Sequence, residues 1–223
     1  MTTRGRTIGV IPARAGSQRL PGKNLRPMAG QPMILWTLQA ARAATTLDGL
    51  VVTSDDDAVL ALAEGQGVAA VRRPAHLAGA DADVVDAVEH ALAQVSGEWD
   101  EVVLLQPTSP LRRPTDIDGV VRLRRDQSAP AALSVSPLAK PVAFHLRQEP
   151  TGRLASAPPL DDVVVVNGAV YVIRTPVLLA TRSFRPEGTV GYRMPAERGW
   201  DVDTFAEFLA CEAALAVANE ASL

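Results

Sequence analysis

The stretch at residues 12–24 constrains this chain most, because it joins an apolar run to glycines and cations. Residues 8–11 are apolar, and the cations Arg14, Arg19 and Lys23 follow within the stretch. Glycines let backbone N–H groups converge on an anion, and fixed cations then neutralise it. Directly after a first strand, such a loop is how α/β proteins hold nucleotide phosphates. The spacing of this loop is neither GxxxxGK[ST] nor GxGxxG. The alternative interpretation is a basic surface turn.

Composition narrows the class of protein. Of the 223 residues, 47% are apolar and 21% are charged, which are ordinary values for a globular protein. The net charge of −3 implies no strongly basic surface, so nucleic acid is not an expected partner. A single cysteine, Cys211, excludes an internal disulfide and favours a reducing compartment; we expect it to be buried and the protein to be cytoplasmic. No apolar run approaches the ~20 residues of a membrane span, so no membrane partner is expected.

Short apolar runs alternate with helical patterns along the chain. This alternation predicts one α/β domain over residues 1–223, with a three-layer, mainly parallel, Rossmann-like sheet. Ligands of such sheets collect beyond the carboxyl ends of the strands, which would bring the loop, Arg73 and Gln106 to one edge. The expected strands are 7–11, 50–53, 69–71, 102–105 and 131–135, and the expected helices are 32–44, 83–95, 116–125 and one that begins at the cap residues 54–56 and ends near 65.

The pattern changes after Pro137. Residues 137–162 contain five prolines, and an extended apolar run over 163–173 follows. We interpret 137–173 as an excursion from the sheet that serves dimerisation or the second substrate. Because an apolar extension beside a core favours association, we expect a homodimer.

A pair of carboxylates stands near the end of the chain. Asp201 and Asp203 are two residues apart, so in an extended segment both face one side while Val202 faces the core. Hard oxygen ligands of this kind suit Mg²⁺ held jointly with substrate phosphates. The alternative is that Asp203 caps the helix expected over 205–218 while Asp201 sits in solvent.

Several stretches together resemble one family. The loop, residues 73–78, the sequence LLQPTSPLR at 104–112, residues 167–171 and the D-x-D pair resemble the CMP-sugar synthetases, or acylneuraminate cytidylyltransferases. The sugar-acid (Kdo) cytidylyltransferases are near relatives. The resemblance implies a nucleotidyltransferase fold and a homodimer. It also implies an enzyme that joins CTP to an acidic sugar and releases pyrophosphate and a CMP-sugar.

The resemblance also implies roles for single residues. It makes Arg14 and Lys23 ligands of the triphosphate, Asn24 and Arg73 contacts to the cytidine, and Gln106 a contact to the acceptor sugar. We add Arg19 from its charge and position. The expected catalytic residues are Arg14, Lys23, Asp201 and Asp203, with Mg²⁺ on the two aspartates; the expected nucleotide site is Arg14, Ala15, Gly16, Ser17, Arg19, Lys23, Asn24 and Arg73; and the expected acceptor site is Gln106 and Asn167.

The acceptor itself stays open at this point. The segment before Asn167 is short and rich in valine, and it lacks the Arg-Gln and Tyr positions of many sialic-acid-activating relatives. N-acetylneuraminate, a deaminated or modified relative, Kdo and a phosphonate acid are all compatible with the sequence. Arg147, Arg153 and Arg174 are candidate carboxylate clamps, with ordinary surface cations as the alternative. A non-catalytic nucleotide-binding module on the same fold is the second hypothesis.

Overall fold

The computed structural model describes residues 5–17, 19–79, 81–140, 144–156 and 162–220, and the side chains up to 217. Gln18, inside the predicted phosphate loop, lies outside them. The centre is a seven-stranded sheet in the order β11-β7-β10-β6-β1-β4-β5, which confirms the expected mainly parallel sheet. The strands are β1 (Thr7–Pro12), β4 (Gly49–Ser54), β5 (Ala69–Arg72), β6 (Glu101–Leu104), β7 (Ala131–Pro137), β10 (Val164–Arg174) and β11 (Val190–Arg193).

One strand runs against the others. β6, β1, β4 and β5 are parallel neighbours, and β11 is parallel to β7, whereas β10 is antiparallel to both β6 and β7. The described part of the connection from β7 to β10 contains no α-helix, and an antiparallel pair needs none. Sequence patterns predicted neither the direction of β10 nor the short edge strand β11.

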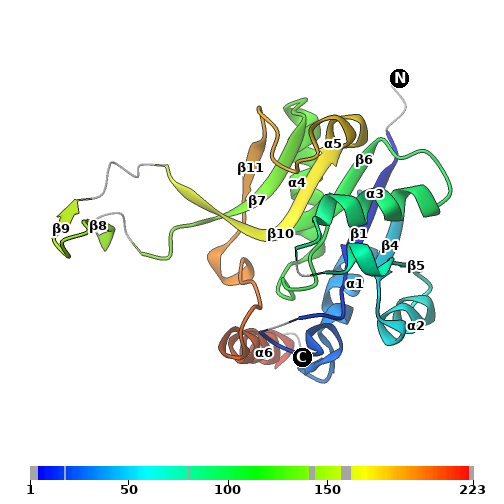
Figure 1. Ribbon diagram of the computed structural model, residues 1–223, viewed down its shortest axis with the longest axis horizontal. Helices are drawn as coiled ribbons and strands as arrows, with labels where there is room; N and C mark the ends of the chain where they lie inside the picture. The colour runs from blue at the N-terminus through cyan, green and yellow to red at the C-terminus, as the bar shows by residue number, and fades with distance from the viewer. Residues whose placement is uncertain (1–4, 18, 80, 141–143, 157–161, 221–223) are drawn as a thin grey trace.

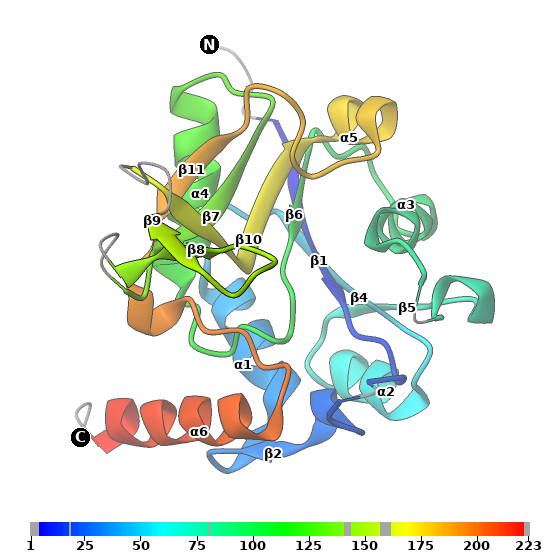
Figure 2. The ribbon, with the colours of Figure 1, turned by 60° about the vertical axis from the view of Figure 1, so that its left-hand side comes forward.

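Helices cover both faces of the sheet (Figures 1 and 2). Because side chains alternate along a strand, Ile8 and Val10 pack with α3 and α5, while Ile11 packs with α1, α2 and α4 on the other face. Among the described residues, no helix is long and apolar enough to cross a membrane. The helices are α1 (Met33–Ala43), α2 (Asp57–Gly65), α3 (Val84–Gln94), α4 (Pro114–Asp126), α5 (Thr175–Thr181) and α6 (Phe205–Glu220), of which α5 was not expected.

A third, smaller core holds α6 against the small hairpin of β2 (Pro27–Met28) and β3 (Gln31–Pro32). Val202, Phe208 and Cys211 lie inside this cluster. Cys211 is fully buried, as expected, and burial raises the pKa of its thiol to about 12. It is therefore a small core residue and not a nucleophile.

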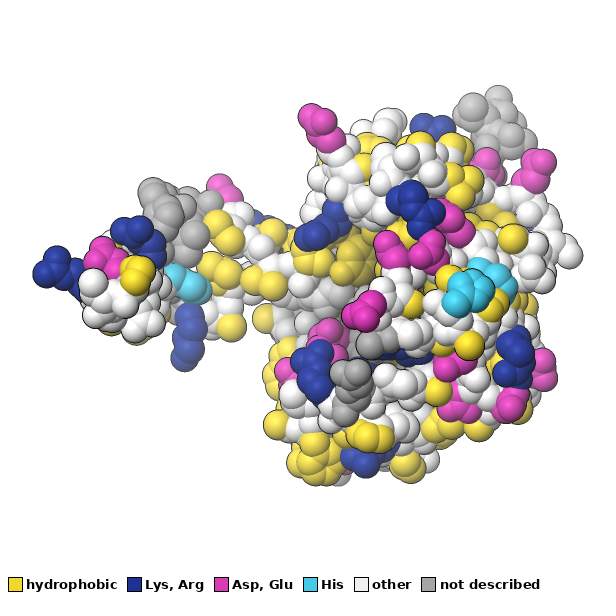
Figure 3. All heavy atoms as spheres, in the orientation of Figure 1, with side chains coloured by type: hydrophobic (Ala, Val, Ile, Leu, Met, Phe, Trp, Pro, Cys, Tyr) yellow, Lys and Arg dark blue, Asp and Glu magenta, His cyan; other side chains and the backbone are white. Residues whose placement is uncertain are grey.

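The segment after β7 forms an arm (Figure 1). Its described tip is a ribbon of β8 (Leu146–Gln148) and β9 (Leu154–Ser156), far from the helices of the body. Figure 3 shows apolar side chains along the stem and basic side chains at the tip. The arm contains fewer residues than the excursion predicted over 137–173, because residues 169, 170, 172 and 173 belong to β10 and are fully buried in the sheet.

Asp118 on α4 anchors the turn that follows α1. Its carboxylate accepts hydrogen bonds from the backbone N–H and the hydroxyl of both Thr45 and Thr46, at 2.7 to 2.9 Å. Burial alone would raise the pKa of Asp118, but these hydrogen bonds outweigh it and hold the pKa below its ordinary value. The carboxylate therefore stabilises the fold above the ordinary aspartate pKa of about 4, and this contribution is lost as the pH falls through the lower pKa of the folded state.

We expect Asp118→Asn to lower the free energy of unfolding by about 2 kcal/mol at pH 7, because charged hydrogen bonds to the turn are lost. Urea titrations at pH 7 and below pH 4 measure this, and the gap to the wild-type protein should narrow at the lower pH. Asp126→Asn, an exposed aspartate at the end of the same helix, is the control. A gap that is equal at both pH values would contradict the role.

Candidate functional site

Three hydrogen bonds fix the loop that follows β1. The backbone N–H of Ala15 donates to Asp55 Oδ1 at 2.9 Å, and the amide of Asn24 donates to the carbonyl of Arg14 at 3.0 Å. Arg14 Nη1 reaches the carbonyl of Gly79, beyond β5, at 2.7 Å. The loop is therefore tied to the residue that follows β4 and to the segment beyond β5, at the edge of the sheet where the sequence predicted a site.

A cleft of about 380 Å³ opens at this edge, and we call it the first cleft. Arg14 and Lys23 line it from the loop, and Pro107 and Thr108 line it from the turn after β6. Ala15, Gly16, Ser17 and Arg19 lie in the loop and do not line this cleft. The predicted site residues that do line it are Arg14, Lys23, Asn24, Arg73, Gln106, Asp201 and Asp203.

Arg73 is a buried cation that lines the first cleft from the segment after β5. Its side chain follows β5, is 6% exposed and donates through Nη2 to the carbonyl of Thr53 at 3.0 Å. Within the described part of the chain its Nε has no partner. Burial lowers the pKa of Arg73 most, while the charge of Asp55 raises it and that of Arg14 lowers it. A desolvated guanidinium that lines the cleft suits an electron-rich ligand atom.

The D-x-D pair has the geometry that its spacing predicted. Val202 is fully buried in the core, while Asp201 and Asp203 both line the first cleft. Lys23 Nζ donates to the carbonyl of Val202 at 2.7 Å and lies 3.4 Å from Asp203 Oδ1. Arg19 forms an ion pair with the other oxygen of Asp203 at 2.7 Å. The loop cations and the carboxylates, distant in sequence, thus meet across one cleft.

Thr204 caps α6, so the alternative in which Asp203 caps this helix is wrong. The hydroxyl of Thr204 accepts from the N–H of Glu207 at 3.3 Å, and Glu207 Oε2 accepts from the N–H of Thr204 at 2.7 Å and of Asp203 at 2.9 Å. This reciprocal pair is a capping box, which the sequence T-x-x-E already contains. Both aspartates are therefore free of a capping role.

Asp201 does not sit in solvent either. Its Oδ1 is buried and has no hydrogen-bond partner among the described residues. Burial raises the pKa of Asp201 most; a hydrogen bond from Thr108 lowers it, and the charge of Asp203 raises it. No group of three or more His, Cys, Asp or Glu side chains in the described part of the chain is placed to hold a metal. The unpaired oxygen and its neighbouring carboxylate fit a Mg²⁺ ion whose other ligands are substrate phosphates and water.

A second cleft, of about 470 Å³, adjoins the first. Gln106 and Asp201 line both clefts, so they stand where the two meet. Gly168, with φ of +77°, forms part of its wall, and a Cβ there would lie 3.0 Å from Gln106 Oε1. The positive φ favours glycine at this position, and the nearby Gln106 side chain leaves little room for a Cβ. The other lining residues are Ser136, Pro137, Ala139, Val165, Val166, Asn167, Tyr171, Ala196, Gly199 and Trp200.

Asn167 lines the second cleft, but its amide is occupied within the protein. Oδ1 accepts from the hydroxyl of Ser134 at 2.6 Å and from the N–H of Ala169 at 3.1 Å, and Nδ2 donates to Ser136 Oγ at 3.0 Å. These bonds hold the irregular part of β10 between Val166 and Tyr171. A contact of Asn167 with substrate stays a prediction.

Arg112 is the site residue that sequence reasoning missed. Its guanidinium is 3% exposed and donates to the carbonyls of Gln106 and Ala169 and to Thr37 Oγ1. One side chain therefore fixes the turn that carries Gln106 and the strand that carries Gly168. Its place in LLQPTSPLR marked the residue, but no local pattern indicated which carbonyls it would meet.

The candidate carboxylate clamps lie apart from the two clefts. Arg174 pairs in register with Glu101, at the amino end of β6 and hence at the opposite edge of the sheet. Arg147, on β8, lies 3.8 Å from Glu149 within the arm. Arg153 precedes β9, also in the arm. Within this chain, the structure brings none of the three into the lining of either cleft.

Comparisons with a family model and with individual relatives both point to cytidylyltransferases. The family model described as cytidylyltransferase matches residues 8–150. The CMP-N,N'-diacetyllegionaminic acid synthase of Legionella pneumophila is 32% identical over 197 residues, which are 82% of this chain and 84% of that protein. The N-acylneuraminate cytidylyltransferase of Escherichia coli is 28% identical over 92% of this chain, which spans only 51% of that longer relative.

Solved structures confirm the nucleotidyltransferase fold. A CMP:2-keto-3-deoxy-manno-octonic acid synthetase complexed with CTP superimposes with a TM-score of 0.73 at 22% identity, covering 95% of this chain and 98% of that one. A 4-diphosphocytidyl-2C-methyl-D-erythritol synthase from Anaerococcus prevotii gives a TM-score of 0.71 at 12% identity, with the same coverage. At such identities the likeness concerns the fold alone.

We expect Arg112→Met to lower the free energy of unfolding by about 3 kcal/mol, because buried carbonyls lose their donor. It should also lower turnover, since Gln106 and Gly168 lose a common anchor. Urea denaturation and steady-state kinetics measure the two effects. Arg113→Met, at the exposed neighbouring arginine, is the matched control. Equal stability of the two variants would show that Arg112 does not hold the site together.

Proposed function

The chain belongs to the cytidylyltransferase family, and on that premise we propose that it joins CTP to an acidic sugar, with release of pyrophosphate and a CMP-sugar. The acceptor is a nonulosonate, such as N-acetylneuraminate or a deaminated or modified relative. The observation that carries the proposal is the meeting of two clefts at Gln106 and Asp201. The first cleft is lined by cations that suit a triphosphate, and the second cleft offers a volume of about 470 Å³ for the acceptor. The names of the relatives support this substrate class.

The first cleft suits a nucleoside triphosphate. Arg14 and Lys23 supply positive charge for the phosphates, and Arg19 adds a third cation nearby through its ion pair with Asp203. Arg73 and Asn24 offer donors to a base that presents acceptor atoms, as cytosine does with O2 and N3. Charge neutralisation by fixed cations favours a pyrophosphate leaving group, whose negative charge grows as it departs.

Asp201 and Asp203 are the residues that would hold Mg²⁺. A Mg²⁺ ion held by these two carboxylates would supply positive charge for the phosphates and would lower the pKa of a nearby hydroxyl. The buried, unpaired Oδ1 of Asp201 supports this role, because an isolated carboxylate oxygen away from water is stabilised by a cation. Lys23 bridges the backbone of this segment and Asp203, and so holds the pair in place.

The second cleft would place the acceptor for attack. In the proposed reaction, the anomeric hydroxyl oxygen forms a bond to the α-phosphorus of CTP. The bond from that phosphorus to pyrophosphate breaks, and the hydroxyl proton is lost to solvent. The attacking oxygen must lie in line with the leaving group, so catalysis is chiefly positioning. Gln106, where the clefts meet, is placed to orient the acceptor.

The arm supports a homodimer, which stays part of the proposal. The side chains of Phe144, Leu146 and Leu154 are 74%, 55% and 59% exposed. Exposure of apolar side chains to water costs free energy, and association with a second copy would remove this cost. A cytoplasmic location also stays a prediction, supported by the single, buried Cys211.

Pyrophosphate release tests the reaction. Each of the four nucleoside triphosphates is supplied with Mg²⁺ and one acid: N-acetylneuraminate, its deaminated analogue, legionaminate, pseudaminate, Kdo or a phosphonate. Release with CTP and one nonulosonate supports the proposal. Release only with Kdo or a phosphonate would replace the acceptor class. CTP binding without release for any acid would favour the non-catalytic module.

We expect Asp201→Asn to lower kcat about 100-fold or more, because a metal ligand at the reacting phosphate is lost. Calorimetry without Mg²⁺ should show CTP affinity within about threefold of wild type, since Arg14 and Lys23 remain. Glu207→Gln makes the same change of charge on the capping box and should leave kcat nearly unchanged. Wild-type turnover by Asp201→Asn would remove the metal assignment.

We expect the double variant Leu146→Asp and Leu154→Asp to be monomeric where the wild-type protein is dimeric, because charges at the arm tip oppose apolar association. Light scattering after size-exclusion chromatography gives the mass of each. Leu179→Asp changes a similarly exposed leucine, 55% exposed on α5, and should keep the dimer. A dimer in the double variant would place the interface elsewhere.

A further inference from the structure

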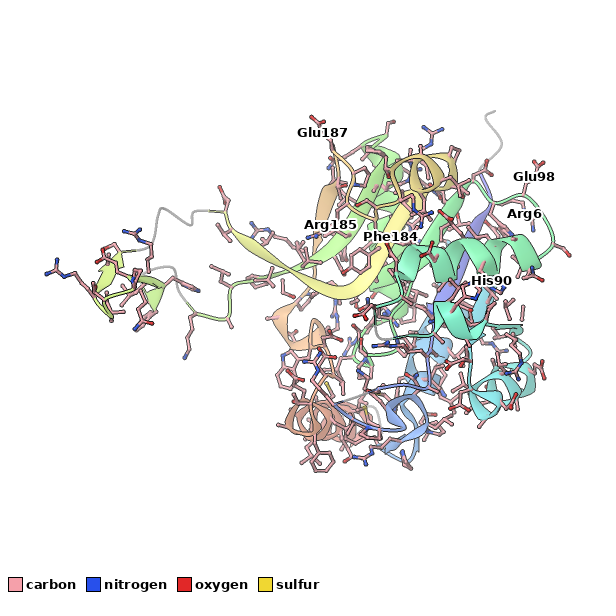
Figure 4. The ribbon with its side chains drawn as sticks, viewed as in Figure 1. Arg6, His90, Glu98, Phe184, Arg185 and Glu187 are labelled. Carbon is pink, nitrogen blue, oxygen red and sulfur yellow. The ribbon has the colours of Figure 1, made fainter. Side chains whose placement is uncertain are left out.

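A further cavity, of about 650 Å³, is bounded by α1, the turn before α4, the segment 197–198 and α6, and we call it the α1–α6 groove. It shares no lining residue with the first or the second cleft. Figure 2 shows α1 beside α6, and Figure 4 shows α6 at the end of the body opposite Arg6 and Glu98. The groove is therefore a separate concavity of the size that small ligands use, and neither proposed substrate is assigned to it.

Much of the wall of the α1–α6 groove is apolar. Trp36 of α1 and Leu111 of the turn before α4 are half-buried and pack against the cluster that contains Leu215 of α6. Val217, on the same helix as Leu215, also lines the groove and is 67% exposed. Contact of such a surface with water is unfavourable, so the wall suits an apolar or aromatic group of a ligand.

The charged side chains of the groove are mostly of one sign. In the described part of the chain, those that line it are Arg112, Arg113 and Arg198 against Glu197 alone. The fully buried Asp116 pairs with Arg198, and counting it leaves an excess of one positive charge. The chain as a whole has a net charge of −3, so this local excess opposes the overall sign. A ligand with a single negative charge would balance it.

Two of these arginines have donors to offer to an anion. The guanidinium of Arg113 is exposed and forms no ion pair with a described residue. Arg198 binds Asp116 through Nε and Nη2, so its Nη1 takes no part in that pair. Hydrogen bonds between a guanidinium and an acid oxygen are stronger than those between neutral groups. Arg112, by contrast, already donates to backbone carbonyls of the catalytic region and adds only its charge.

We propose that the α1–α6 groove is a binding site for a small organic monoanion. The apolar or aromatic part of this ligand packs on Trp36 and Leu215, and Arg113 and Arg198 bind its acidic group. The inference goes beyond the proposed function, because it involves neither CTP nor the acceptor sugar. It stands on the shape of the groove, its apolar wall and its excess of positive charge.

The test uses dansylglycine, a fluorescent carboxylate on a naphthalene ring, and dansylamide, which has the same ring and no charge. Fluorescence titration of the full chain measures the affinity of each. We expect wild type to bind dansylglycine about fivefold or more tightly than dansylamide, because only the carboxylate meets the two arginines. Saturating CTP with Mg²⁺ should not displace it, since the first cleft is a different site.

Two variants of the groove should weaken the binding of dansylglycine. Arg113→Gln removes a cation and should lower the affinity about fivefold, and Val217→Asp places a carboxylate on the wall and should lower it about tenfold. The controls change the same residue types outside the groove: Arg42→Gln at an exposed arginine of α1, and Leu209→Asp at a leucine of α6 that is 47% exposed. Both controls should stay within about twofold of wild type.

Equal affinities of wild type for the two probes would overturn the inference, because the acidic group would then contribute nothing. Unchanged binding of dansylglycine in both Arg113→Gln and Val217→Asp would overturn it as well, since the probe would lie elsewhere. Displacement of the probe by CTP would place it in the first cleft and overturn the separate site. None of these readouts depends on turnover, so the inference and the proposed function fail independently.

Discussion

The buried guanidinium of Arg112 joins the parts on which the site depends. It lies between α1, the turn after β6 and the irregular part of β10, and it donates to an acceptor oxygen on each. No carboxylate forms an ion pair with it in the described part of the chain. Burial lowers its pKa to about 9, with the charge of Asp116 raising it, so the side chain stays protonated at neutral pH. Removing a charged guanidinium from water costs free energy, and the hydrogen bonds to these three oxygens offset that cost only while the oxygens keep their positions.

The segment that carries the D-x-D pair depends on a similar set of long-range contacts. Arg198 makes a two-pronged ion pair with the fully buried Asp116 of α4, at 2.7 and 3.0 Å. The N–H of Val202 donates to the carbonyl of Thr108 at 2.7 Å, which ties the pair to the turn after β6. Gly199 packs so closely on Ser136 and Asn167 that a Cβ has no room. The carboxylates are therefore presented by a rigid segment and not by a loose loop.

Much of the fold follows from the sequence alone. Periods of two and of 3.6 residues identified the strands β1, β4, β5, β6 and β7 and the helices that alternate with them, because these periods follow from local backbone geometry. The extended run of β10 was predicted, but its antiparallel direction was not, since the direction of a strand depends on how its connection returns to the sheet. The edge strand β11 and the helix α5 were not predicted. The capping box of α6 was readable as T-x-x-E, although the alternative interpretation of the D-x-D pair placed the cap at Asp203.

For the site, the sequence by itself determined the chemistry: a glycine-containing loop with cations, and two carboxylates on one side of an extended segment. Only the tertiary structure decided which distant groups meet. It brought Lys23 to Asp203 and placed Gln106 and Asp201 at the junction of two clefts. The physical reason is that local spacing fixes the face to which a side chain points. The partner across the sheet depends on packing between segments that are far apart in the chain.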